Sequence, residues 1–259
     1  VIKKHMTRYG VDVLYGEARF RNPNTLVLED EGRETTLKAD AFVLACGTEA
    51  RRPTSIPFND STIIDSDQLY TAMKRLPRKL IIIGAGVIGM EYASIFSVLG
   101  VEVHVLNRRK RFLDFIDDEV ILAHLEQLER RGVHLHREAN ILKVADNDPP
   151  EVFLEDGTRI QGDLIMVAAG RVGTADRLQV QNVGLETTDR GLLEVNGYFQ
   201  TAAPHVYAAG DIIGAPSLAA TSKEQGRLAA RGLLGREVDL ERSEEFPFGV
   251  YTIPEMSWV

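Results

Sequence analysis

A glycine-rich turn between two apolar runs is the feature that most constrains how this chain can fold. Residues 79–83 form the first run, 84–89 the turn and 101–106 the second run, with a helical pattern between the turn and the second run. A strand, a G-x-G-x-x-G turn, a helix and a second strand at this spacing predict a βαβ unit that binds a dinucleotide. The pyrophosphate would lie against unpaired amides at the positive end of the helix dipole. The alternative is a glycine turn that serves helix packing alone.

Each glycine of the turn has a physical role in this prediction. Gly84 permits the tight turn, Gly86 lets the ligand approach the backbone, and Gly89 lets the helix pack closely against the strand. The predicted cofactor-binding residues of the turn are Gly84, Ala85, Gly86, Val87, Ile88 and Gly89.

The residue after the second strand predicts which dinucleotide binds. An acidic side chain at this place would accept a hydrogen bond from the adenosine ribose and repel a 2′-phosphate, but here the residue is Asn107. An amide bonds a hydroxyl without repelling a phosphate, and Arg108, Arg109 and Arg111 follow as candidate phosphate ligands. We therefore expect both NAD and NADP to bind there. The alternative is that these arginines form a solvated loop.

Composition argues against several classes of function. The formal net charge is −8 and the sequence pI is near 5.4, which argues against a nucleic-acid or anionic-membrane surface. Glycines and glutamates interrupt the apolar stretch 80–106, so we expect no membrane span and, without an export pattern, a cytoplasmic protein. We expect the single cysteine, Cys46, to be a small packed residue. His134 and His136 share a strand face but lack a nearby metal-ligand spacing, so we expect no metal site.

Hydrophobic periodicity and turn residues predict an α/β chain. Ser66 is the expected cap of a first short helix. We expect strands over 11–19, 25–29, 41–45, 133–136, 164–169 and 206–209, an antiparallel meander over 141–160, and helices over 66–75, 119–131 and 222–234.

Several separated motifs together resemble those of the pyridine nucleotide-disulfide oxidoreductases, which are flavoproteins with two dinucleotide-binding domains. Residues 84–91 are similar to their G-x-G-x-I-G-x-E fingerprint, and residues 201–211, T-A-A-P-H-V-Y-A-A-G-D, to their flavin motif. The other segments that carry the resemblance are 16–18 (G-E-A), 45–48 (A-C-G-T), 168–171 (A-A-G-R), 218–219 (L-A) and 251–255 (Y-T-I-P-E). The resemblance covers essentially the whole chain.

The resemblance implies a fold and a domain order. It predicts a Rossmann-like NAD(P)-binding domain over 73–195, inserted in an incomplete FAD-binding domain over 1–72 and 196–249, with the start of a dimerisation domain at 250–259. We expect the chain to be a fragment that lacks the first FAD segment and most of the dimerisation domain. We expect the full-length protein to be a homo-oligomer.

The resemblance also implies site residues. Asp211 would bind the ribityl chain of FAD, and Glu91 would lie near the nicotinamide and the flavin, where its partner in the family is a lysine that this chain lacks. The remaining implied cofactor contacts are Ala18, Gly170, Arg171, Gly210 and Ala219.

Within the family, the chain is most similar to enzymes that pass hydride from NADPH to bound FAD and then to NAD in a ping-pong cycle. Asn107 suits that activity, and G-R-V-G over 170–173 departs from the G-R-x-P-N common in lipoamide dehydrogenases. We expect the fragment to bind NAD or NADP, but neither to hold FAD tightly nor to turn over. The alternatives are a dihydrolipoamide dehydrogenase-like disulfide oxidoreductase and a noncatalytic dinucleotide-binding sensor.

Overall fold

The computed structural model describes residues 2–236 and 248–258, which form two compact units. Unit 1 contains the described residues 2–48 and 173–236. Unit 2 contains residues 49–172 and 248–258. Unit 2 is therefore inserted in unit 1 along the chain. Within the described residues, no helix combines the length and hydrophobicity needed to cross a membrane.

The boundaries of the two units differ from the domain boundaries that the sequence predicts. Strand β6 (Ile63–Asp65) pairs with a strand of the central sheet, so the segment 49–72 packs in unit 2. Ala175, Val180 and Val183 pack in the hydrophobic core of unit 1, so the segment 173–195 joins that unit. The assignment of the predicted domains to FAD and NAD(P) stays a prediction.

A five-stranded parallel sheet forms the centre of unit 2. Its strand order is β6-β13-β7-β8-β9. The strands after β6 are β7 (Lys79–Ile83), β8 (Glu102–Leu106), β9 (Val133–His136) and β13 (Leu164–Val167). Apolar strands of this kind are typical of parallel sheets that are covered on both faces. The prediction of an α/β, Rossmann-like fold is confirmed.

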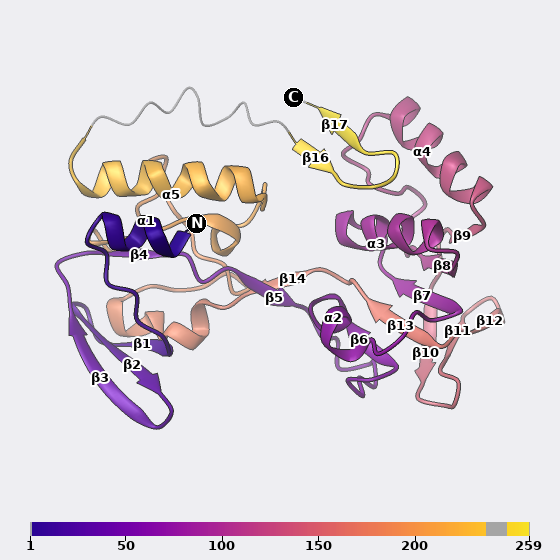
Figure 1. Ribbon diagram of the computed structural model, residues 1–259, viewed down its shortest axis with the longest axis horizontal. Helices are drawn as coiled ribbons and strands as arrows, with labels where there is room; N and C mark the ends of the chain where they lie inside the picture. Colours follow the sequence, from indigo (N-terminus) through magenta and orange to yellow (C-terminus); the bar gives the residue numbers. More distant parts are fainter. Residues whose placement is uncertain (1, 237–247, 259) are drawn as a thin grey trace. The chain divides into compact units, whose positions relative to one another are not determined.

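Side-chain alternation along the strands directs two hydrophobic cores to the two faces of this sheet. In β7, Leu80 and Ile82 pack in the core that includes helices α3 (Val87–Val98) and α4 (Asp118–Arg130). The intervening Ile81 and Ile83 pack in the core of the meander. Figure 1 shows α3 and α4 on one side of the sheet and the meander on the other. The meander strands are β10 (Ile141–Ala145), β11 (Glu151–Leu154) and β12 (Arg159–Gln161), as predicted.

Unit 1 combines a three-stranded antiparallel sheet with a short parallel pair. The sheet contains β1 (Glu17–Asn22), β2 (Thr25–Asp30) and β3 (Arg33–Lys38), and β4 (Phe42–Leu44) pairs in parallel with β15 (Val206–Ala208). The other elements of unit 1 are the helices α1 (Ile2–Arg8) and α5 (Ala219–Leu233) and the 3-10 turns η2 (Ala175–Leu178), η3 (Val180–Val183) and η4 (Gly210–Ile213).

The other elements of unit 2 are the 3-10 turn η1 (Ser66–Gln68), the helix α2 (Leu69–Ala72) and the strand pair of β16 (Phe248–Val250) with β17 (Met256–Trp258). Strands β5 (Thr48–Ala50) and β14 (Arg171–Gly173) pair with each other and contain the residues at which the chain passes from one unit to the other.

Three predicted elements differ clearly in extent from the structure, and one strand was not predicted. The first strand begins at Glu17 and not at residue 11, and β3 was not predicted at all. Helix α5 begins at Ala219, three residues before the predicted start, and the helix predicted over 66–75 is only η1 followed by α2. Its cap is Asp65, whose side chain accepts hydrogen bonds from the amides of Asp67 and Gln68, and not Ser66.

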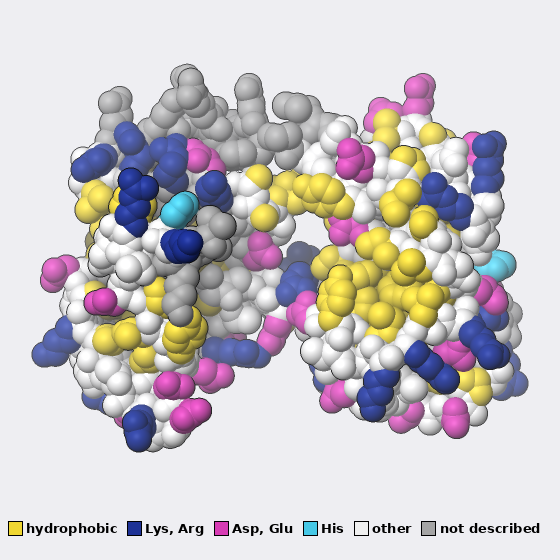
Figure 2. All heavy atoms as spheres, in the orientation of Figure 1, with side chains coloured by type: hydrophobic (Ala, Val, Ile, Leu, Met, Phe, Trp, Pro, Cys, Tyr) yellow, Lys and Arg dark blue, Asp and Glu magenta, His cyan; other side chains and the backbone are white. Residues whose placement is uncertain are grey.

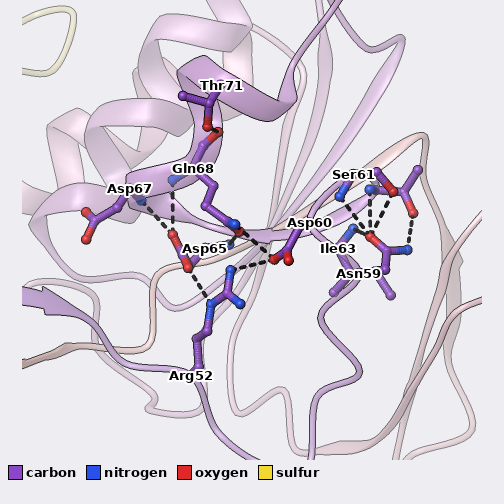
Figure 3. A network of polar contacts seen from close by, with 10 residues as sticks. Arg52, Asn59, Asp60, Ser61, Ile63, Asp65, Asp67, Gln68 and Thr71 are labelled. Atoms are coloured by element: carbon purple, nitrogen blue, oxygen red, sulfur yellow. Dashed lines mark hydrogen bonds and ion pairs between the residues drawn. The ribbon is translucent and has the colours of Figure 1, made fainter. Parts of the chain in front are cut away.

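A polar network holds the irregular connection between residues 51 and 68 to the edge of the central sheet. Arg52 donates to Asp65 at 2.6 Å and to Asp60 at 2.7 Å, and Gln68 also donates to Asp60. Asn59 accepts from the backbone amides that lead into β6 (Figure 3). Since Asp65 is 5% exposed, its charge needs these partners.

Helix α4 offers a matched test of the core. Leu128 is 0% exposed and packs against the sheet, whereas Leu122 is 61% exposed on the same helix. We expect Leu128→Ala to lower the free energy of unfolding by about 2–5 kcal/mol, because it removes buried contacts and leaves a cavity. Leu122→Ala should change it by less than about 0.5 kcal/mol. Urea denaturation followed by circular dichroism measures both, and equal effects would contradict the described packing.

Candidate functional site

A cavity of about 740 Å³ lies in unit 2 at the carboxyl ends of β7, β8 and β13. This is the edge at which doubly wound sheets bind ligands. Eight of the predicted site residues line it: Gly84, Ala85, Gly86, Asn107, Arg108, Arg109, Arg111 and Gly170. Val87, Ile88 and Gly89 do not line it but form the first turn of α3, which starts at its wall.

The glycine turn has the geometry that the sequence predicts for a phosphate cradle. Gly84 has a φ of +110°, and a Cβ there would lie 2.3 Å from the carbonyl oxygen of Ala168. A Cβ on Gly89 would lie 2.0 Å from the carbonyl oxygen of Gly84. Gly86 is different, because a Cβ there would meet nothing within 4 Å. The fold thus requires Gly84 and Gly89, whereas Gly86 leaves open space beside the cavity.

The start of α3 is a place for an anion. Gly86 is the N-cap residue and makes no side-chain capping bond, so the first amides of the helix are not covered by a side chain. Such amides have no partner within the helix, and the helix dipole adds positive potential. A pyrophosphate is the kind of group that this arrangement binds.

Asn107 has a structural role beside its predicted contact with a ribose. Its side chain donates to the carbonyl of Arg111 at 2.8 Å and accepts from the amide of Arg109 at 3.3 Å. It is 8% exposed and lines the cavity. An amide can donate a second hydrogen bond and accept a second one, so Asn107 can shape the basic loop and still contact a ligand.

The arginines of the loop differ in how they are engaged. Arg109 pairs with Asp114 at 2.6 Å, and Arg111 pairs with Asp118. No hydrogen bond or ion pair of the Arg108 guanidinium occurs within the described residues, and Arg108 is exposed at the cavity. Arg108 is therefore the arginine of the three that is best able to bind a phosphate.

Sequence reasoning missed three charged residues of the cavity, namely Arg51, Glu155 and Asp114, which pairs with Arg109. The amide of Arg51 donates to the carbonyl of Gly170 at 3.0 Å, and this bond holds Arg51 at the cavity. The amide of Glu155 donates to the carbonyl of Asn140 at 3.0 Å, and this bond holds Glu155 there. Each bond joins segments that are distant in sequence, so no local pattern indicated them.

Arg171 does not line the cavity, although the resemblance implied a cofactor contact. It pairs with Asp67 through two hydrogen bonds of 2.7 and 3.1 Å. Burial disfavours the charged carboxylate of Asp67, but the bonds from Arg171 and from the amide of Ala50 outweigh it and lower the pKa of Asp67. The pair joins β14 to η1 and supports the cavity wall at Gly170 from outside.

Glu91 also has a partner that the sequence did not indicate. Its carboxylate accepts from the amide of Tyr251 at 2.8 Å, although the two residues are 160 positions apart. Glu91 does not line the cavity within the described residues. Beside it, Ser94 bonds both the amide and the carbonyl of Ile253, so this turn of α3 holds the segment between β16 and β17.

Unit 1 brings two of the motif segments together. The parallel pair β4 and β15 ends in 45–48 and 209–211, and Asp211 accepts from the hydroxyl of Thr48 at 3.4 Å. The amide of Gly210 donates to Gln225 on α5 at 2.8 Å. Ala18 lies in the separate antiparallel sheet and pairs with Leu28, and Ala219 is the exposed first residue of α5.

The expectation for Cys46 is wrong. Cys46 is exposed and not packed. It lies two residues after the end of β4, where the chain has left the core, and its carbonyl accepts from the hydroxyl of Thr174 at 3.1 Å. The apolar run that ends at Ala45 gave no signal that the core stops at Leu44.

Alanine substitutions in the turn test which of its glycines the fold requires. We expect Gly84→Ala to lower the melting temperature clearly, because its Cβ collides with backbone and its φ is positive. Gly86→Ala should leave the melting temperature within about 1–2 °C, because surface changes away from strain cost little. Thermal unfolding followed by circular dichroism tests this, and an equal loss in the two variants would contradict the described turn.

Comparison with known proteins agrees with this geometry. Soluble pyridine nucleotide transhydrogenase from Shigella boydii is 43% identical over 250 residues, which are 96% of this chain and 53% of the relative. The chain thus spans about half the length of the curated relatives it matches. LpdA from Mycobacterium tuberculosis superposes with a TM-score of 0.90 at 28% identity, over 99% of this chain and 57% of that one.

A further solved structure has the same fold. The HOCl-induced flavoprotein disulfide reductase RclA from Escherichia coli superposes with a TM-score of 0.88 at 25% identity, over 99% of this chain and 59% of that one. The family model described as pyridine nucleotide-disulphide oxidoreductase matches residues 1–226. The chain belongs to the pyridine nucleotide-disulphide oxidoreductase family.

Proposed function

We propose that the full-length protein is a flavoprotein that transfers hydride between NADPH and NAD. The observation that carries the proposal is the cavity in unit 2, where an uncapped helix start, an asparagine in place of an acidic residue and an unpaired arginine meet. The name of the Shigella boydii relative, soluble pyridine nucleotide transhydrogenase, supports the same activity.

The residues of the cavity would bind either dinucleotide. The amides at the start of α3 hold the pyrophosphate, and the open space beside Gly86 admits it. Asn107 bonds the adenosine ribose, and Arg108 binds the 2′-phosphate of NADP. Since no acidic residue stands at position 107, neither dinucleotide is repelled there.

Unit 1 offers residues that fit part of an FAD site. FAD, when bound, supplies the ring system that takes hydride from one nicotinamide and gives it to the other. Asp211 makes one long hydrogen bond to Thr48, so its carboxylate keeps acceptor capacity for the hydroxyls of a ribityl chain. Ala18, Gly210 and Ala219 would contact FAD through backbone atoms. Glu91, fixed by the amide of Tyr251, would orient groups near the nicotinamide.

We further propose that segments outside this chain complete the active protein. Hydrophobic side chains gather on the face of unit 2 that Figure 2 shows. Exposed apolar residues there are Tyr70 on α2, Ile95 and Val98 on α3, and Leu99 directly after α3. Such surfaces mark interaction sites, which supports a homo-oligomer of the longer protein. The 259-residue chain alone would bind NAD or NADP without retaining FAD, and it would be inactive.

A disulfide oxidoreductase is the second candidate, since one superposed structure is named a flavoprotein disulfide reductase. This chain has a single cysteine, so a redox pair would have to come from residues outside it. Two assays of the full-length protein separate the candidates. Reduction of its flavin by NADPH followed by reoxidation with an NAD analogue supports hydride transfer, whereas NADH-dependent reduction of a disulfide substrate, without that transfer, supports the second candidate. A full-length protein without flavin would contradict both and favour a dinucleotide sensor.

Arg108 gives the sharpest test of cofactor recognition. We expect Arg108→Ala to weaken NADPH binding by roughly tenfold and NADH binding much less, because only NADPH carries the 2′-phosphate that a charge-assisted hydrogen bond would hold. Fluorescence titration of the purified chain with each reduced cofactor measures both affinities. The control is Arg130→Ala, which removes an exposed arginine of α4 that does not line the cavity. Unchanged selectivity in Arg108→Ala would remove this residue from the specificity argument.

A further inference from the structure

A second group of ionisable side chains lies at the outer edge of the central sheet, away from the cavity. Strand β8 contributes Glu102 and His104, and the edge strand β9 contributes His134 and His136. The register pairs His104 directly with His134, so by alternation all four side chains share one face of the sheet. None of them lines the dinucleotide cavity.

Three of these side chains are spaced as metal ligands are. One ligand atom from each of Glu102, His104 and His134 lies within 4.8 Å of the other two. The Nε2 atom of His104 lies 3.0 Å from Oε1 of Glu102, and the rings of His104 and His134 stack with centroids 4.3 Å apart. Zinc ligands lie about 2.0–2.2 Å from the ion, which puts tetrahedral ligand atoms about 3.3–3.6 Å from one another.

The three ligand atoms reach that spacing when the Glu102 side chain moves and the His134 ring, which is stacked on the His104 ring, turns its nitrogen toward the same point. Glu102 and His134 are exposed, so their side chains can rotate, while the 9% exposed His104 stays fixed. Lys79 holds Oε1 of Glu102 at 2.7 Å, but the carboxylate has a second oxygen that can take the ion or the lysine. A carboxylate and two imidazoles form a donor set that suits zinc and similar ions.

His136 is placed to support the buried ligand. Its Nε2 atom lies 3.0 Å from Nδ1 of His104, on the side of the ring away from Glu102. A histidine that binds a metal through one nitrogen usually donates a hydrogen bond from the other, and this bond fixes the ring.

We propose that Glu102, His104 and His134 bind a divalent transition-metal ion of the zinc class, with His136 as the positioning residue and water at the open coordination place. The expectation of no metal site rested on spacing along the chain, and the carboxylate and the first histidine come from a strand thirty residues before His134. The ion would join the edge strand β9 to β8 and so stabilise unit 2.

The experiment uses the untagged chain without nucleotide and has three readouts. Calorimetric titration with Zn²⁺ should give one site, Co²⁺ should give the visible absorption of a tetrahedral ion, and Zn²⁺ should raise the melting temperature relative to protein in chelator. His134→Ala and Glu102→Gln change exposed residues and should each abolish all three signals. His136→Ala should weaken binding by about 10- to 100-fold, as is usual for a residue that orients a ligand.

The matched control is His5→Ala, which removes an exposed histidine from α1 outside the cluster and should leave every signal unchanged. Circular dichroism confirms that each variant is folded. Absence of Zn²⁺ binding to the parent chain overturns the proposal. Binding that persists unchanged in both His134→Ala and Glu102→Gln overturns it as well, because the ion would then be held elsewhere.

Discussion

The close approach of the turn after β7 to the end of β13 is the constraint on which the rest of unit 2 depends. The place that a Cβ of Gly84 would take lies 2.3 Å from the carbonyl of Ala168, and that of Gly89 lies 2.0 Å from the carbonyl of Gly84. Backbone thus packs on backbone without side chains between. This contact lets α3 begin at the sheet edge, with its N-cap residue Gly86 in the cavity lining. A larger residue at either glycine would move the helix and the cradle together.

Bonds between distant segments then fix the walls around that cradle. Arg171 and Asp67 are 104 positions apart, and Glu91 and Tyr251 are 160 apart. Among the described residues, neither pair lines the cavity. The Arg171–Asp67 pair holds the segment that follows Gly170 in the cavity wall, and the Glu91–Tyr251 pair holds the C-terminal segment on α3. The family motifs therefore contain residues of two kinds, those that line the cavity and those that hold the fold. Gly86 belongs to the first kind, and Arg171 to the second.

Local pattern predicted most of the fold, because the parallel strands are continuous apolar runs and the meander turns carry their own signals. It failed where burial does not follow local pattern. Strand β3 is polar and almost wholly exposed, so it shows no alternation, and its pairing with β2 alone makes it a strand. The cavity lining was predicted at the glycine turn and at residue 107. Arg51 and Glu155 were missed because tertiary bonds bring them there. The ionisable cluster was missed for the same reason, since it needs the register of two strands.

Strand β8 links the two proposed sites, and this has a mechanical consequence. At its carboxyl end, the amide of Asn107 donates to the carbonyl of His136, and the carbonyl of Asn107 accepts from the amide of Ala139, both at 2.9 Å. The basic loop is therefore anchored to β9, an edge strand that pairs only with β8 among the strands that the structure describes. Edge strands are held by half as many ladder bonds as central ones and open more readily. Whatever orders β9, including an ion on its exposed histidine face, would also order the basic loop that carries Arg108 at the cavity.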